Sequence, residues 1–314
     1  MRIIRGQHSL AAGRGTRAPG AVTVGNFDGV HRGHQKVIAQ ISRLGAADAL
    51  VPRVVIFEPQ PNEFFARGEP PARLTRLSEK LRLFARLGVT ETLVLRFDAA
   101  FSAMDAATFV REILVEGLNV KRLVIGDDFQ FGRGREGDFA ALTAFGADFG
   151  FSVTRADTFE LGGARVSSTR IRTLLAEHRL AEAAELLGRP YSISGRVVHG
   201  RKEGRTIGFP TANIHLGRRR VPISGIFAVR VHGIAGHPLP GSAYVGSRPV
   251  IEDDQIVLEV HLFDFDEDIY GRRIEVEFVG WIRDDLALGS MAELKAQIAR
   301  DNADARRILA TAAA

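Results

Sequence analysis

Apolar and polar residues follow one pattern in the first half of the chain and another in the second. In the first half, short apolar runs rich in β-branched residues alternate with longer stretches whose apolar residues recur every three or four positions. The runs predict strands and the stretches predict helices, an alternation typical of a parallel sheet with right-handed crossovers. We expect strands at 21–25, 53–57, 91–97, 121–126 and 151–157, and helices at 34–48, 75–88, 105–118 and 139–150.

A longer helical pattern, TRIRTLLAEHRLAEAAELLG, covers 169–188 and predicts one continuous helix. Gly188 suits the C-terminal cap of this helix, and Pro190 follows closely enough to prevent its continuation. Because the periodicity changes directly afterwards, we place the domain boundary here. The predicted domains are 1–188 and 189–314.

Beyond the boundary, apolar and polar residues alternate with a period of two. The runs SISGRVV, GIFAVRV, IVLEVHLFDF and RRIEVEFVGWI are separated by Gly and Pro turns, which predicts a small antiparallel barrel. A final helix is expected from Ser290, which forms a capping-box pattern with Glu293. Met291, Leu294 and Ile298 would form the packed face of that helix.

Composition narrows the class of protein. The 314 residues are 45% hydrophobic and 25% charged, as in a globular protein with two domains. The chain has no cysteine, which excludes disulfides, thiolate nucleophiles and cysteine-bound zinc. No signal-peptide pattern and no run of roughly 20 apolar residues is present, so we expect a cytoplasmic protein without a membrane segment. The net charge of +5 suits polyanions, either nucleic acid or phosphorylated small molecules.

The stretch VGNFDGVHRGHQKVI, 24–38, places a glycine-rich turn between the first predicted strand and the first predicted helix. Ligands of open α/β folds bind at this edge of the sheet. His31 and His34 are three residues apart at the helix N-terminus, where free amides and the helix dipole favour anions. This HxGH arrangement is typical of nucleotidylyltransferases, which hold the charge of a transferring phosphate with positioned donors. The alternatives are two histidines without a ligand, or zinc, for which no third ligand is nearby.

The segment SSTRIR, 167–172, opens the predicted long helix and offers a second anion site. Either serine suits the N-cap, and its hydroxyl, the free amides and Arg170 are all donors. An ordinary helix cap with solvated arginines explains this segment equally well by itself. Combined with HxGH, the segment is a candidate site for the β- and γ-phosphates of ATP.

The second half carries its own candidate chemistry. In PTAN, Thr211 and Asn213 face the same side of a strand and offer neutral oxygens that suit Mg²⁺ arriving with ATP. In IVLEVHLFDF, Glu259 points away from the apolar face and could serve as general base for an alcohol. A plain strand end and a solvated outer face are the alternatives for these residues. The following DFDED is expected to form a hairpin turn.

These motifs together resemble the bacterial bifunctional riboflavin kinase/FMN adenylyltransferase family, also called FAD synthetase. The resemblance covers nearly the whole chain through the following segments in order: GNFDGVHRGHQ, FEPQP, ARLTRLSEK, GDDFQFG, SSTRIR, LGRPYSISGRVVHG, GFPTANI, EVHLFDF and the final helix. It implies an α/β fold with an N-terminal Rossmann-like nucleotidylyltransferase domain and a C-terminal six-stranded flavokinase barrel. The barrel would phosphorylate riboflavin to FMN, and the first domain would adenylate FMN to FAD with release of pyrophosphate. Both steps would use ATP and Mg²⁺.

The resemblance also assigns roles by position. It implies that Gly25, Asn26, Phe27 and Asp28 form the nucleotide-binding turn, with His31 and His34 at the transferring phosphate. Asp128 falls near the nucleotide and flavin, and Ser167, Ser168, Thr169 and Arg170 match the phosphate-binding segment. In the barrel, Thr211 and Asn213 match metal and nucleotide residues, and Glu259 matches the general base for the riboflavin 5′-hydroxyl. Three departures concern flavin affinity: Gln60 in place of a common histidine, Phe227 in place of a common tyrosine, and VGSRPV without the usual threonine.

Two other readings compete with the two-step enzyme. In the first, only one half is active and the other is a binding module, although Thr211, Asn213 and Glu259 are all present. In the second, the basic chain and small barrel bind nucleic acid. A nucleic-acid platform needs aromatic residues interleaved with Lys and Arg, whereas IVLEVHLFDF is acidic there. We therefore expect riboflavin, FMN and ATP as partners, and no nucleic acid.

Overall fold

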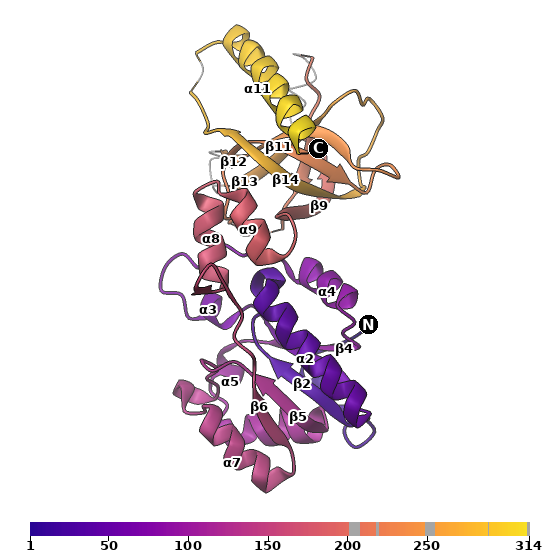
Figure 1. The fold of residues 1–314 in the computed structure, drawn as a ribbon, viewed down its shortest axis with the longest axis vertical. Helices are drawn as coiled ribbons and strands as arrows, with labels where there is room; N and C mark the ends of the chain where they lie inside the picture. Colours follow the sequence, from indigo (N-terminus) through magenta and orange to yellow (C-terminus); the bar gives the residue numbers. More distant parts are fainter. Residues whose placement is uncertain (201–207, 218–219, 249–254, 288, 313–314) are drawn as a thin grey trace. The chain divides into compact units, whose positions relative to one another are not determined.

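The computed structural model describes residues 1–314 except 201–207, 218–219, 249–254, 288 and 313–314 (Figure 1). The chain divides into two compact units. Unit 1 comprises Met1–Pro71 and Thr75–Ser167, and unit 2 comprises Ala72–Leu74 and Ser168–Ala314. Each unit is a layered domain with its own core.

Unit 1 is built on a parallel sheet in the order β1-β4-β3-β2-β5-β6. The strands are β1 (Arg2–Arg5), β2 (Gly20–Val24), β3 (Val51–Glu58), β4 (Glu91–Arg96), β5 (Val120–Ile125) and β6 (Ser152–Arg155). The last five confirm the predicted strands. The edge strand β1 was not predicted, because RIIR is short and flanked by charges.

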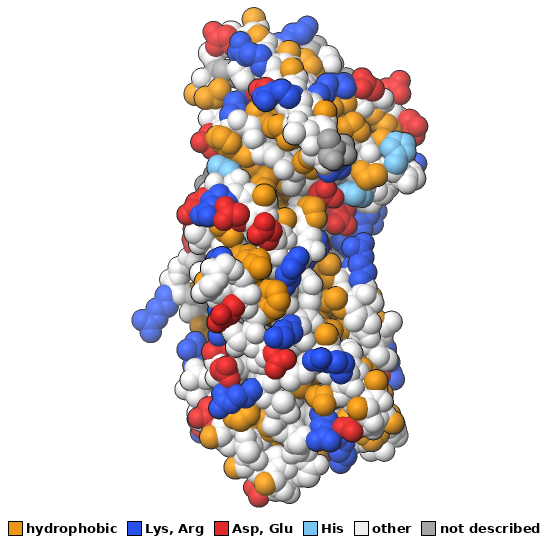
Figure 2. All heavy atoms as spheres, in the orientation of Figure 1, with side chains coloured by type: hydrophobic (Ala, Val, Ile, Leu, Met, Phe, Trp, Pro, Cys, Tyr) orange, Lys and Arg blue, Asp and Glu red, His pale blue; other side chains and the backbone are white. Residues whose placement is uncertain are grey.

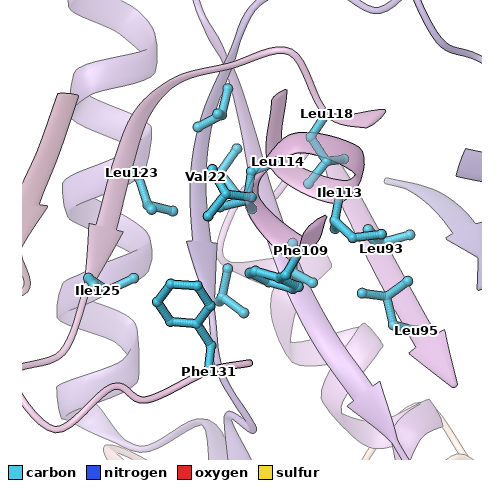
Figure 3. Packing of buried hydrophobic residues seen from close by; sticks show 14 of the residues in the cluster. Val22, Leu93, Leu95, Phe109, Ile113, Leu114, Leu118, Leu123, Ile125 and Phe131 are labelled. Carbon is cyan, nitrogen blue, oxygen red and sulfur yellow. The ribbon is translucent and has the colours of Figure 1, made fainter. Parts of the chain in front are cut away.

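Successive residues of a strand point to opposite sides of the sheet. Apolar side chains lie on both sides, and helices cover both faces. On one face, α2 (Arg32–Asp48) and α4 (Leu77–Arg86) pack Ile41 and Phe84 against Val54 and Ile56. The opposite face is covered by α1 (Gly6–Ala11), η2 (Phe109–Gly117) and α7 (Phe139–Phe149). Figure 3 shows this second layer, in which Phe109, Ile113 and Leu114 of η2 share one cluster with strand residues.

The remaining helices of unit 1 are short. They are η1 (Asp28–Val30), α3 (Pro61–Phe64), α5 (Ala99–Ser102), α6 (Ala106–Thr108) and η3 (Arg133–Arg135), and a small hairpin pairs β7 (Glu160–Leu161) with β8 (Ala164–Arg165). The predicted helix at 105–118 is divided: a single turn of α6 leads into the wider π-helical turns of η2. The apolar spacing there is compatible with both helix types, so the sequence did not distinguish them.

Unit 2 contains a closed six-stranded antiparallel barrel in the order β10-β13-β12-β11-β14-β9. Its strands are β9 (Ser192–Val198), β10 (Ala212–His215), β11 (Gly225–His232), β12 (Leu239–Arg248), β13 (Gln255–Leu262) and β14 (Arg273–Arg283). The predicted barrel is confirmed, although β12, which contains Pro and two glycines, was not among the predicted strands. Phe227 and Phe278 meet edge to face in the interior with ring centroids 5.2 Å apart.

The prediction of one long helix at 169–188 is wrong. The segment forms α8 (Ser168–Ala176) and α9 (Leu180–Leu187), and the chain turns at His178, whose φ is 60°. The His178 ring stacks on Trp281 of β14 with centroids 4.7 Å apart, and its Nε2 lies 3.4 Å from an Asp284 carboxylate oxygen. Gly188 ends α9 in the left-handed conformation, as predicted. Since the compact units divide at Ser167, before both helices, the boundary after 188 stays a prediction.

The final helix α11 (Met291–Thr311) packs on the barrel, and its buried positions continue the predicted face at seven-residue spacing toward the C-terminal end of the helix. Ser290 accepts a hydrogen bond from the Glu293 amide, so the predicted cap is confirmed. Met291, however, is 57% exposed, and Asp301, Ala305 and Leu309 are the buried positions. Asp301 receives a two-pronged ion pair from Arg283 at 2.8 and 2.7 Å, and this pair fixes α11 to the end of β14.

Candidate active sites

The turn after β2 lies at the point of unit 1 where a ligand is expected. The chain passes from β2 to its neighbour β3 on one side, whereas β5 lies on the other side of β2. This reversal of strand order makes the carboxyl end of β2 the topological switch point of the sheet. The first candidate site therefore lies at the sheet edge where open α/β folds bind their ligands.

His31 and His34 lie together at the start of α2. His31 is the N-cap residue, and its Nδ1 accepts a hydrogen bond from the His34 amide at 3.4 Å. The two rings stack with centroids 3.6 Å apart and an interplanar angle of 19°. Because Nδ1 of His31 acts as acceptor, the neutral His31 ring carries its proton on Nε2. The site thus presents a ring N–H donor beside the free amides of the helix N-terminus.

The environment of His34 favours its neutral form. Burial lowers the pKa of His34 well below its usual value, and the nearby charges of His31, Lys80 and Arg165 lower it further. Its Nδ1 is buried and finds no hydrogen-bond partner among the described residues. Neighbouring cations and a helix N-terminus together form a region of positive potential, which suits a polyphosphate.

The other residues of the nucleotide-binding motif take different places in the turn. Gly25 leaves room for the Phe27 ring, which would lie 3.2 Å from a Cβ at this position. Phe27 packs between His34 and Phe84, with centroid distances of 5.0 and 5.5 Å. The Asn26 carbonyl accepts a hydrogen bond from the buried Lys80 ammonium. Asp28 is itself buried, and its Oδ1 accepts a hydrogen bond at 3.0 Å from the Thr75 amide, which lies outside the turn.

Asp128 is connected to this site through Arg165. Its side chain is exposed and accepts a hydrogen bond from Arg165 at 3.2 Å, and Arg165 is one of the cations that act on His34. The segment that follows Arg165 returns to α2: the Val166 carbonyl would lie 3.7 Å from a Cβ on Gly33. Ser167 then ends unit 1. Ser168, Thr169 and Arg170 form the first turn of α8 in unit 2.

An aromatic surface that the sequence did not predict lies beside this edge of the sheet. Phe64 and Phe65 follow β3, and Phe97 follows β4, with ring centroids between 5.1 and 5.6 Å apart. Phe64 is 38% exposed and Phe65 is 57% exposed, which is unusual for phenylalanine. The signal available in the sequence was the adjacent FF pair, which follows FEPQP after two further residues.

The second candidate site lies on the outer face of the barrel. Asn213 of β10 is directly opposite Glu259 of β13, and Glu259 is directly opposite Tyr244 of β12. Directly opposed residues of antiparallel strands share a face, so these three side chains form one row across three strands. Leu258 and Val260, on either side of Glu259, point into the core. The strand register thus places the proposed base beside the proposed metal residue.

Thr211 lies next to a cavity of about 480 Å³. The cavity is lined by Val260 and Leu262 of β13, by Thr211, and by the predicted DFDED turn up to Tyr270. His261 fixes the adjoining backbone, because its Nδ1 lies 2.8 Å from the Pro210 carbonyl, which can only accept a hydrogen bond. The pocket combines apolar side chains with the Thr211 hydroxyl and the acidic side chains of the DFDED turn.

The side-chain oxygens of PTAN are suitable ligands for a hard cation that is also held by phosphate. Thr211 supplies a hydroxyl and Asn213 an amide oxygen, and a Cβ on Gly200 would lie 2.5 Å from Asn213 Cγ, so this glycine makes room for the amide. Within the described part of the chain, no group of three or more His, Asp or Glu side chains could hold a metal by itself. A cation here would depend on oxygens from its nucleotide.

The three departures from the family pattern fall in different surroundings. Gln60 is buried at the N-cap of α3, and its Nε2 has no hydrogen-bond partner among the described residues. Phe227 is fully buried inside the barrel and packs on Phe278. The last residues of VGSRPV, and most of the glycine-rich loop before PTAN, lie outside the described residues.

No helix in the described ranges is long and apolar enough to cross a membrane.

Family models match both halves of the chain. The FAD synthetase model matches residues 15–170, and the riboflavin kinase model matches residues 187–309. The two matches leave residues 171–186 between them in the sequence, which contain most of α8 and α9.

Individual proteins are similar over almost the whole chain. The bifunctional riboflavin kinase/FMN adenylyltransferase of Escherichia coli (strain K12) is 49% identical over 98% of this chain and 97% of its own length. The proteins of the same name from Haemophilus influenzae and Pseudomonas fluorescens are each 46% identical, over 96% and 100% of this chain and 97% and 99% of their own. A solved structure named macrolide-efflux protein, from Streptococcus pneumoniae, is 30% identical with a TM-score of 0.81 and covers 96% of this chain and 97% of its own.

Proposed function

The chain belongs to the bifunctional riboflavin kinase/FMN adenylyltransferase family, and we propose that it catalyses its two reactions at the two sites described above. Riboflavin kinase activity converts riboflavin and ATP to FMN, and FMN adenylyltransferase activity converts FMN and ATP to FAD and pyrophosphate. The observation that carries the assignment of sites is that each family model covers one motif set. His31 and His34 lie within the FAD synthetase match, and Asn213 and Glu259 within the riboflavin kinase match.

Adenylyl transfer is assigned to the β2–α2 turn. A phosphate oxygen of FMN attacks the α-phosphorus of ATP, the new P–O bond forms, and pyrophosphate leaves. Negative charge on the transferring phosphate rises during this step, so fixed donors that need no reorganisation lower the barrier. The ring N–H of His31, the amides at the start of α2 and a donor on neutral His34 are suited to this role. Arg165 and Lys80 add positive potential without a covalent step.

The phosphates of ATP are assigned to the segment that follows Val166. Ser167, Ser168, Thr169 and Arg170 stay predicted to bind the leaving β- and γ-phosphates, supported by their donors and by the return of the chain to Gly33. Gly25, Asn26 and Phe27 stay predicted to line the nucleotide, and Asp128 to lie near nucleotide and flavin. The position of Arg165 supports the role of Asp128, because this arginine donates a hydrogen bond to Asp128 and is also one of the cations near His34.

The flavin ring of FMN is assigned to the aromatic surface formed by Phe64, Phe65 and Phe97. An isoalloxazine ring is flat and largely apolar, and exposed aromatic rings at the ligand edge of a sheet offer it a stacking partner. This position follows the carboxyl ends of β3 and β4, next to the turn that carries His31. The buried Nε2 donor of Gln60, between β3 and Phe64, is available for a polar atom of the same ligand.

Riboflavin phosphorylation is assigned to the row formed by Asn213, Glu259 and Tyr244. The Glu259 carboxylate would take the proton of the riboflavin 5′-hydroxyl as that oxygen attacks the γ-phosphorus of ATP, and ADP would leave. A base fixed on a rigid strand between two neighbouring strands keeps its position during the step. The cavity beside Thr211 would hold the nucleotide.

Mg²⁺ is proposed for both steps. In the barrel it would be held by the Thr211 hydroxyl and the Asn213 amide oxygen together with ATP oxygens, and it would neutralise phosphate charge. The cytoplasm is proposed as the location, because both reactions consume ATP and the chain carries no cysteine. Riboflavin, FMN and ATP are the proposed ligands. On the face drawn in Figure 2, Lys and Arg are mixed with Asp and Glu, which does not favour nucleic acid as a partner.

The test separates the sites by mutation within one chain. His31→Ala should abolish FAD formation from FMN and leave FMN formation from riboflavin unchanged, and Glu259→Ala should do the reverse. Products are separated by chromatography after reaction with ATP and Mg²⁺. Loss of both products in either well-folded variant would refute the assignment of the two reactions to separate sites.

A further inference from the structure

The turn that carries the two histidines has an unusual backbone. Phe27, Gly29 and Val30 all have positive φ, at 49°, 80° and 44°. Glycine adopts this conformation freely, but a β-branched residue such as Val30 rarely does. Such a conformation persists only where the surrounding structure fixes it, and it is typical of ligand-binding turns.

Thr75 fixes the centre of this turn from outside it. Thr75 precedes α4 and is 4% exposed. Its backbone N–H donates to Asp28 Oδ1 at 3.0 Å, and its hydroxyl lies 3.3 Å from the same oxygen. The hydroxyl oxygen also accepts a hydrogen bond from the Gly29 amide at 2.9 Å. One threonine therefore holds both a side chain and a backbone group of the turn.

Other contacts hold the two ends of the turn. The Lys80 ammonium, from α4, donates to the Asn26 carbonyl, and the Gln35 side chain, from α2, donates to the Val30 carbonyl at 2.9 Å. Thr75 acts between these ends, on the two residues that precede Val30 and His31. Removing its hydroxyl removes the hydrogen bond to the buried Gly29 amide and the contact with Asp28 Oδ1, which weakens the hold on the turn.

We propose that Thr75 is a positioning residue for adenylyl transfer, acting through its hydroxyl on the turn that places His31 and His34. This inference rests on the proposal that the β2–α2 turn is the adenylyl-transfer site. It also gives Asp28 a second role, because its carboxylate is the acceptor that orients Thr75. A displacement of about 1 Å at catalytic groups can cost about 100-fold in rate.

The test uses Thr75→Val, which keeps the shape and removes the hydroxyl, and Thr75→Ser, which keeps the hydroxyl. We expect Thr75→Val to lower kcat for FAD formation by about 100-fold. The KM values for FMN and ATP should change little, because the binding surfaces remain. Thr75→Ser should restore most of the rate. Thr92→Val is the matched control, since Thr92 is fully buried in β4 and its hydroxyl contacts Met1.

The circular dichroism spectrum and thermal transition of the full chain report whether each variant is folded, because riboflavin kinase activity belongs to the other unit and would survive a defect in unit 1. If Thr75→Val does not fold, Thr75→Ala replaces it under the same criteria. A rise in KM without a fall in kcat, or an unchanged rate, would overturn the inference. His34→Ala separates the two proposals: loss of FAD formation in His34→Ala with a normal rate in Thr75→Val overturns the inference alone. A normal rate in His34→Ala overturns the proposed site and the inference with it.

Discussion

Gly200 offers a way to displace one candidate metal ligand without touching it. A Cβ at Gly200 would lie 2.5 Å from Asn213 Cγ and 2.7 Å from Asn213 Oδ1. Ordinary contacts between such atoms lie at about 3.5 Å. In Gly200→Ala, the Asn213 amide must therefore move by about 1 Å, away from its position beside Glu259.

The expected effect falls on phosphorylation rather than on folding. The atoms that a Cβ would meet belong to the end of the Asn213 side chain, which can rotate. The loss in free energy of unfolding should therefore not exceed about 3 kcal/mol, the upper end of the usual cost of overpacking. The rate of FMN formation should fall by about 100-fold, or about 2.7 kcal/mol of barrier. Gly236→Ala is the matched control, because its Cβ would meet nothing within 4 Å.

The assay compares initial rates of FMN formation from riboflavin with rates of FAD formation from FMN. Gly200→Ala should lower the first by about 100-fold and leave the second unchanged, and Gly236→Ala should leave both unchanged. Normal FMN formation in Gly200→Ala would show that the position of the Asn213 amide does not matter. The reasoning that places this residue at the metal and nucleotide would then be refuted.

Three further predictions concern pH, a buried ion pair and the metal. Because the pKa of His34 is lowered in the folded protein, the unfolded chain binds an extra proton as the pH falls below about 6.5, so folding loses stability there. His34→Gln should remove this loss, measured as the difference in urea midpoint between pH 7.5 and 5.5. Asp301→Ala leaves the Arg283 charge without its partner and should lower the free energy of unfolding by about 3–5 kcal/mol. Unfolding in urea is measured by the fluorescence of Trp281. The exposed Asp304→Ala should cost less than about 1 kcal/mol. Chelation of Mg²⁺ should stop both reactions, and either product forming under excess chelator would contradict the proposed cation.

The spacing of apolar residues predicted most of the architecture, because that spacing depends on whether a strand is buried on one face or on both. The four inner strands of unit 1 are apolar runs, since helices cover both sides of the sheet. The barrel strands alternate because one face is inside. The edge strand β1 and the Gly- and Pro-containing β12 carry too weak a local signal, and they are strands because their neighbours offer hydrogen-bonding partners.

The break between α8 and α9 could not be predicted from the residues of this segment alone. AEHRLAEAAE favours a helix at every position, with neither Gly nor Pro. The chain turns at His178 because the ring stacks on Trp281 and pairs with Asp284, far along the sequence. Tertiary contacts here outweigh helix propensity, which amounts to less than about 1 kcal/mol per residue.

The candidate sites were predictable where their residues lie close in sequence or on one strand face. The spacing of His31 and His34 predicted their shared position at the helix start, and alternation predicted that Glu259 faces outward. The contribution of Thr75 was not predictable, because it depends on contacts between segments separated by α2 and β3. The opposition of Glu259 to Asn213 and Tyr244 depends likewise on strand register, which a single sequence does not specify.

The central claim is that the two reactions occur at two independent sites, one at the β2–α2 turn and one on the barrel. Mixing two inactive variants tests it most directly: His31→Ala and Glu259→Ala are incubated separately and together with riboflavin, ATP and Mg²⁺. We expect FMN alone from the first, no product from the second, and FAD from the mixture. FMN that accumulates in the mixture without FAD would contradict the account, because it would mean that the change at Glu259 had also disabled adenylyl transfer.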